Sequence, residues 1–147
     1  MKFQVIWVGK TRDRNYKALQ EDYLQRLSHF ARIEIVEVKD GGGKEVEGQR
    51  IIAQLNPTLV VCLLDVIGDH KTSHQFAGDI EKWQIDGRKE MTFVIGGADG
   101  VSAEVARRAS HRLSLSLLTF THEMARVVLL EQIYRAFTII KGFPYQK

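Results

Sequence analysis

The chain has 147 residues, of which 44% are hydrophobic and 27% are charged, and its formal net charge at pH 7 is +3. These values exclude an intrinsically disordered chain, and the length predicts a single domain over residues 1–147. The mild positive charge permits an RNA partner but does not require one.

Strands and helices alternate through the first half of the sequence. Residues 3–8 predict a strand, residues 15–30 a helix with one apolar face, and residues 33–38 a half-exposed strand. Three glycines at positions 41–43 predict a flexible loop, either a linker or a lid. Residues 45–55 predict a helix that ends before the breaker pair Asn56-Pro57.

The same alternation continues through the second half. Residues 59–65 and 91–95 are continuous apolar runs, which are typical of strands buried on both faces of a parallel sheet. Further elements are expected as helices at 74–85, 102–110 and 124–140 and a last strand at 114–118. The order predicts an α/β fold with a largely parallel sheet and helices on both faces.

The helix expected at residues 124–140 is apolar around most of its circumference. One sheet in a short chain cannot cover such a helix, so we expect a homodimer interface here; the alternative is burial within the chain. The helix also carries Arg126, Glu131 and Arg135. Either Glu131 pairs with Arg135 one turn away, or at least one arginine faces a phosphate or a substrate base.

Nothing in the sequence indicates secretion, a membrane span or a metal. Cys62 is the only cysteine and lies in an apolar run, so we expect a small buried side chain. The first residues lack a signal-peptide pattern, and the most apolar segment, residues 125–140, is short for a membrane span. His70 and His74 have no third ligand nearby. We therefore expect a cytoplasmic protein with no membrane and no metal partner.

A glycine-rich turn follows the predicted strand at 91–95. Its order, Gly96-Gly97-Ala98-Asp99-Gly100, matches neither the dinucleotide fingerprint nor a P-loop. Turns at the carboxyl ends of strands bind ligands in α/β proteins, so this turn is either one wall of a ligand site or a plain tight connection.

Four segments keep a common order along the chain: residues 94–100, residues 118–122, residues 126–136 and the pair Pro144-Tyr145. With shorter matches at 47–50, 64–65 and 82–88, they resemble the ribosomal large subunit methyltransferase H family over nearly the whole chain. Members of that family are SPOUT-class enzymes.

The resemblance implies an α/β fold with a C-terminal trefoil knot, a homodimer, and S-adenosyl-L-methionine bound in the knot. It also implies methylation of N3 of a pseudouridine in large-subunit (23S) ribosomal RNA. The chain has no spare segment for a dedicated RNA-binding domain. We therefore expect recognition by the surface of the dimer itself, on the large subunit or the assembled ribosome.

Carried over position by position, the resemblance implies cofactor contacts at Leu64, at Gly97, and along a wall made of Leu115, Ser116, Leu117, Leu118, Thr119 and Phe120. Apolar sides suit adenine, and a glycine lets a ligand approach the backbone. The catalytic candidates are Tyr145, Arg126 and His122. Tyr145 would orient the base, and Arg126 would favour the anionic base or hold a phosphate. His122 either assists the proton transfer or makes a structural hydrogen bond.

The chain departs from the family pattern in two places. Gln146 stands where members commonly have histidine, and Thr121 stands where they commonly have proline. Gln146 cannot accept a proton. Besides the methyltransferase, two further interpretations therefore stay open: a non-catalytic ribosome- or RNA-binding module that retains the fold, and an unrelated nucleotide-binding protein.

Overall fold

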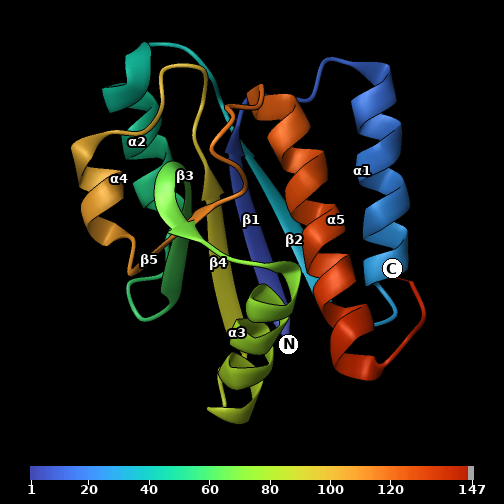
Figure 1. Ribbon diagram of the computed structural model, residues 1–147. Helices are drawn as coiled ribbons and strands as arrows, with labels where there is room; N and C mark the ends of the chain where they lie inside the picture. Colours follow the sequence, from blue (N-terminus) through green and yellow to red (C-terminus); the bar gives the residue numbers. More distant parts are fainter. Residues whose placement is uncertain (146–147) are drawn as a thin grey trace.

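The computed structural model describes residues 1–145 of the chain and shows a parallel sheet with helices on both sides (Figure 1). Five strands and five helices alternate in the described part: β1 (Lys2–Val8), α1 (Arg14–Leu27), β2 (Arg32–Val38), α2 (Gly43–Gln54), β3 (Val60–His70), α3 (Ser73–Ile85), β4 (Glu90–Ile95), α4 (Ala103–Arg108), β5 (His111–Ser114) and α5 (His122–Lys141). The sheet order is β2-β1-β4-β3-β5, and every neighbouring pair is parallel. The predicted α/β fold is confirmed.

The two faces of the sheet carry separate cores because successive strand side chains point in opposite directions. Phe3, Val5 and Trp7 of β1 pack on the face covered by α1, α3 and α5. Ile6 and Val8 of the same strand pack on the other face, against α2 and α4. The central strands are thus buried on both faces, as their continuous apolar runs predicted.

The long helix α5 packs between α1 and α3 (Figure 1). Its core side chains are fully buried within the chain, Val127, Val128, Ile139 and Ile140 are half-buried, and Met124 near its start is exposed. Arg135 donates to Glu131 from Nε at 3.0 Å and from Nη2 at 2.5 Å, so the local ion pair, one of the two alternatives left open by the sequence, is present. Intrachain packing therefore covers most of the helix.

Several boundaries differ from the sequence prediction, and three of these differences affect the loops and strands near the carboxyl edge of the sheet. The last strand is His111–Ser114 rather than 114–118, because the chain turns immediately after Ser114. Strand β3 runs on to His70, and its pairing with β5 is interrupted between Leu64 and Asp69. The glycine loop is shorter than expected because Gly43 already begins α2.

Candidate functional site

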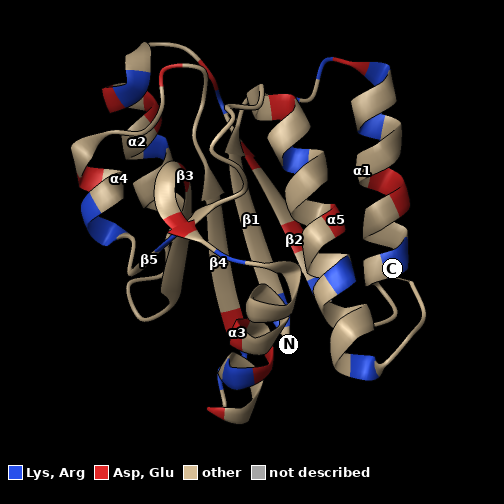
Figure 2. Cartoon of the chain, in the orientation of Figure 1, with Lys and Arg blue, Asp and Glu red and all other residues tan. Residues whose placement is uncertain are grey.

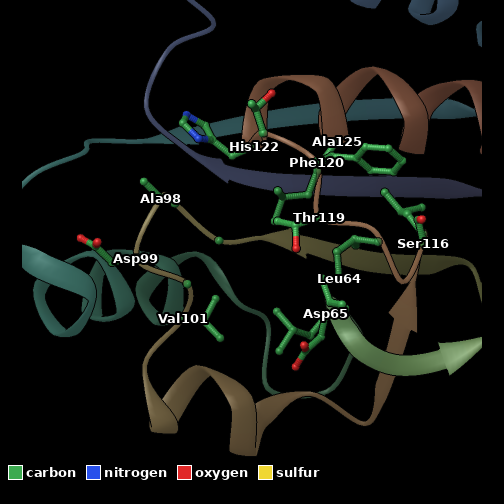
Figure 3. Close-up of a pocket in the computed structure, with 18 of the residues that line it drawn as sticks. Leu64, Asp65, Ala98, Asp99, Val101, Ser116, Thr119, Phe120, His122 and Ala125 are labelled. Carbon is green, nitrogen blue, oxygen red and sulfur yellow. The ribbon is translucent and has the colours of Figure 1, made fainter.

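A cavity of about 770 Å³ opens at the carboxyl end of β4 and at the end of the regular part of β3, whose pairing with β5 is interrupted after Leu64 (Figure 3). Three segments enclose it: residues 63–66 of β3, the turn after β4, and the loop between β5 and α5. The volume lies in the range of small-molecule sites. Its lining includes Leu64, Gly97, Leu115, Ser116, Leu118, Thr119 and Phe120, seven of the eight residues expected to contact a cofactor.

The turn after β4 forms one wall through its own backbone. The N–H of Gly100 donates to the carbonyl of Gly97 at 3.0 Å, and Gly100 has a φ of +80°, which favours glycine. A Cβ on Gly96 would lie 2.8 Å from Val101 and 3.0 Å from the Gly100 carbonyl carbon. The turn is therefore closed tightly on itself and presents a bare backbone to the cavity.

Gly97 lines the cavity, and a side chain at this position would also be crowded by the protein. A Cβ there would lie 3.1 Å from Glu47 Oε1 and 3.4 Å from Val8 Cγ1. The missing side chain therefore allows α2 and the end of β1 to approach the turn. The expected contact between Gly97 and the cofactor stays a prediction.

The loop after β5 forms the opposite wall and is not a strand. Ser114 Oγ donates to the carbonyl of Ser116 at 3.0 Å, and Ser116 Oγ accepts from the N–H of Leu118 at 3.0 Å. These bonds fold the chain into a turn that leaves Leu117 73% exposed. Leu117 does not line the cavity, so its expected contact with the cofactor stays a prediction.

Charged residues that the sequence argument did not assign to the site also line the cavity. Arg112 Nη1 donates to Asp65 Oδ2 at 3.4 Å, which joins β5 to the end of β3, and Asp99 lies on the glycine turn. The position of Asp65 directly after a buried strand was the available signal for its role. The cavity thus combines apolar walls with two carboxylates and one guanidinium.

His122 and Ala125 complete the cavity from the first turn of α5 (Figure 3). Thr121 caps this helix, because its hydroxyl accepts from the N–H of Met124 at 3.3 Å. The His122 ring makes no hydrogen bond with the side chains or backbone of residues 1–145. The cap therefore fixes the helix start and leaves the imidazole free to face a ligand.

Arg126 does not line the cavity. It is 0% exposed, and its Nη2 donates to the carbonyl of Val8 at 2.6 Å while Nη1 donates to Thr11 Oγ1 at 2.9 Å. The guanidinium lies 4.8 Å from the centre of the Trp7 ring. Burial lowers the pKa of Arg126, and Glu123 and Glu37 partly oppose this. In this structure the side chain holds α5 to β1 and does not reach the cavity.

Tyr145 lies at the far end of α5 from the cavity. Its hydroxyl donates to Glu131 Oε1 at 3.1 Å and lies 3.5 Å from the Tyr23 hydroxyl. Burial raises the pKa of Tyr145, as do its contacts with Tyr23 and Glu131. Glu131 follows His122 by nine positions, or about 13 Å along a helix. The protomer therefore brings His122 to the cavity and leaves Tyr145 away from it.

Two further features bear on function. Across residues 1–145, no three His, Cys, Asp or Glu side chains are grouped so that they could hold a metal ion. In the same part of the chain, no helix combines the length and apolarity needed to cross a membrane.

Comparisons with known proteins match nearly the whole chain to methyltransferases. The family model described as "Predicted SPOUT methyltransferase" matches residues 1–146. Proteins named "Ribosomal RNA large subunit methyltransferase H" from Carboxydothermus hydrogenoformans, Listeria monocytogenes and Anaeromyxobacter sp. are 40%, 39% and 40% identical, each over 100% of both chains. The "Crystal structure of probable rRNA-methyltransferase from Porphyromonas gingivalis" aligns with a TM-score of 0.53 at 13% identity, over 95% of this chain and 69% of that chain, which shows a shared fold.

Proposed function

This chain belongs to the SPOUT methyltransferase family, and on that premise we propose that it transfers a methyl group from S-adenosylmethionine to N3 of a pseudouridine in large-subunit ribosomal RNA. The observation that carries the proposal is the cavity of about 770 Å³ at the carboxyl end of β4 and the end of the regular part of β3. It lies where α/β folds bind small ligands, and the segments expected to hold the cofactor enclose it.

The residues that line the cavity fit a nucleoside-containing sulfonium. Leu64, Ile95 and Leu118 provide apolar surface for an adenine ring, and the turn after β4 offers backbone groups for its polar edges. The carboxylates of Asp65 and Asp99 complement a molecule that carries positive charge. The bound donor would supply an electrophilic methyl group, so the protein mainly has to align donor and acceptor.

The acceptor nitrogen must lose its proton before or during transfer. His122 faces the cavity, has no hydrogen bond within the described residues, and carries the side chain best suited to accept a proton near neutral pH. Tyr145 would remain a neutral phenol, because burial raises its pKa, and would orient the base by donating to it in exchange for its bond to Glu131. Arg126 would position His122 rather than contact the substrate, because its bond to Val8 fixes the helix that carries His122.

A second copy of the chain would bring Tyr145 to the cavity. The tyrosine of one protomer stands about 13 Å along α5 from its own His122. Large apolar side chains are exposed on the segments that enclose the cavity: Ile67 is 81% exposed and Leu118 is 77% exposed. We propose a homodimer that covers this surface, as large exposed apolar patches mark interaction sites. Equal sedimentation of wild type and Ile67→Glu as monomers would contradict it.

The remaining expectations follow from the same premise. The loop from β5 to α5 passes the ends of β3 and β4 to reach the other face of the sheet, which is the route that a C-terminal trefoil knot would take. All of residues 1–147 would serve as one methyltransferase domain, and a ribosomal substrate would be consistent with a cytoplasmic protein. Gln146, one of the two departures from the family pattern, lies outside the described residues.

A cavity-filling substitution tests the proposal. The Thr119 side chain points into the cavity (Figure 3), yet the residue is largely exposed, so Thr119→Trp should block the donor site without disturbing the core. We expect S-adenosylmethionine binding by calorimetry, and transfer of labelled methyl groups to undermodified large subunits, to be lost. Ile85→Trp is the matched control, because Ile85 is 77% exposed at the end of α3 and should retain both.

Wild-type protein that binds the donor but transfers no methyl group to undermodified subunits would refute the enzymatic proposal and leave an RNA-binding relative. Unchanged donor binding by Thr119→Trp would show that the cavity is not the cofactor site.

A further inference from the structure

Two loops stand beside the cavity at the same edge of the sheet. Residues 9–14 follow β1 and residues 39–44 follow β2; together we name them the basic loop pair. Glu47 connects them to the cavity, because its Oε2 accepts from the N–H of Gly41 at 2.9 Å while its Oε1 lies against Gly97. Glu123, next to the cavity residue His122, accepts from the N–H of Arg12 at 2.9 Å and of Asp13 at 3.0 Å.

The backbone of the basic loop pair is held from several sides. Arg126 binds Val8 and Thr11, and Glu123 binds the next two residues. Arg50 Nη1 donates to the carbonyls of Lys39 and Gly41, each at 2.8 Å. An ion pair of 3.3 Å between Arg12 and Asp40 joins one loop to the other. The loops are therefore preorganised, and their remaining cationic side chains project into solvent.

The basic loop pair has a net positive charge. The basic loop pair carries five Lys or Arg and two Asp, a net charge of +3 that equals the formal charge of the full chain. Figure 2 shows these Lys and Arg segments near the starts of α1 and α2. Lys10, Arg14, Lys39 and Lys44 are exposed and form no ion pair within residues 1–145.

Two of these cations lie at helix starts. Arg14 begins α1, next to the N-cap carboxylate of Asp13, and Lys44 shares the first turn of α2 with Glu45. The positive end of the helix dipole disfavours cations there by a few tenths to about 1 kcal/mol each. Exposed cations that form no ion pair in such positions are suited to an anionic partner.

We propose that the basic loop pair binds the phosphate backbone of the RNA strand that enters the cavity. This inference rests on the proposed function, because it takes the substrate to be RNA. Phosphate contacts orient a nucleic acid without reading its sequence, and each contact releases condensed counterions. The loops would thus hold the strand in register while the target base reaches His122 and the cofactor cavity.

The test removes three charges and leaves the supporting bonds in place. Lys10→Gln/Lys39→Gln/Lys44→Gln changes only exposed side chains, and none of the three lysine side chains forms a hydrogen bond or ion pair within residues 1–145. The matched control, Lys82→Gln/Arg88→Gln/Lys89→Gln, removes the same charge near the amino end of β4. Binding to undermodified large subunits is measured from 50 to 300 mM salt by filter retention, together with kcat, KM and donor binding.

The loop variant should bind RNA about tenfold or more weakly, and its salt slope should fall by about 2 to 3. Its KM for subunits should rise, while kcat at saturation, donor binding and the control variant stay near wild type. Equal losses in both variants, or none in the loop variant, would overturn the inference. If the wild-type protein transfers methyl groups and the loop variant binds RNA as well as wild type, the RNA-binding inference is refuted and the proposed enzymatic function stands. If the wild-type protein transfers no methyl groups but the loop variant loses RNA binding, the enzymatic function is refuted and the RNA-binding inference stands.

Discussion

Replacement of Arg126 by methionine tests whether Arg126 stabilises the fold or contacts the substrate. Methionine keeps most of the volume over Trp7 but removes both hydrogen bonds. Two bonds from a charged donor contribute about 3–6 kcal/mol together, and the contact with Trp7 adds about 1 kcal/mol. Removing a buried cation that has no carboxylate bonded to it regains several kcal/mol of desolvation free energy. We expect a net loss of about 3 kcal/mol in the free energy of unfolding.

Urea unfolding at matched protein concentration measures this loss, because a dimer would make the transition concentration-dependent. For a chain of this length the expected decrease in Tm is about 6–12 °C. Arg12→Met is the matched control: Arg12 lies in the loop that Arg126 holds, but its side chain is 79% exposed and should contribute far less. An Arg126→Met protein that is as stable as wild type yet inactive would refute the structural role and restore the substrate contact.

Two further predictions concern packing and chemical reactivity. Gly48→Ala should lower the free energy of unfolding by about 2 kcal/mol, because the added Cβ would lie 2.4 Å from Ser102 Oγ. Gly78→Ala should raise it by about 0.4–1 kcal/mol, because nothing lies within 4 Å of the added carbon. Equal Tm values for the two variants would contradict this packing. Burial raises the pKa of Cys62 to about 12, so iodoacetamide at pH 8 should label the unfolded protein far faster than the native one, and rapid labelling of native protein would show that the thiol is accessible.

The sequence predicted well those features that depend on local pattern. The apolar runs at β3 and β4 indicated central parallel strands, and the spacing of Glu131 and Arg135 indicated their ion pair. The strand predicted at residues 114–118 was wrong for a physical reason. A run of leucines and small polar residues is compatible with a buried strand and equally with a loop beside an apolar cavity. Only the turn made by Ser114 and Ser116 distinguishes the two.

Features that depend on distant segments could not be predicted. Arg126 and Val8 are 118 positions apart, and no local pattern indicates that a cation will bind that carbonyl. The same holds for Gly97, whose neighbours Glu47 and Val8 come from other elements. The separation of Tyr145 from the cavity depends on the position of α5, because Tyr145 follows the carboxyl end of this helix and the cavity lies at its amino end.

The bond between Arg126 and Val8 has a consequence for biosynthesis. β1 pairs early with β2, yet its other partner β4 and the helix that holds its end emerge much later from the ribosome. Pairing between such remote segments is slow because a long loop must close beforehand. One edge of the apolar strand β1 therefore stays unpaired until β4 has been made, and fragments that end before β4 should aggregate rather than form the cavity.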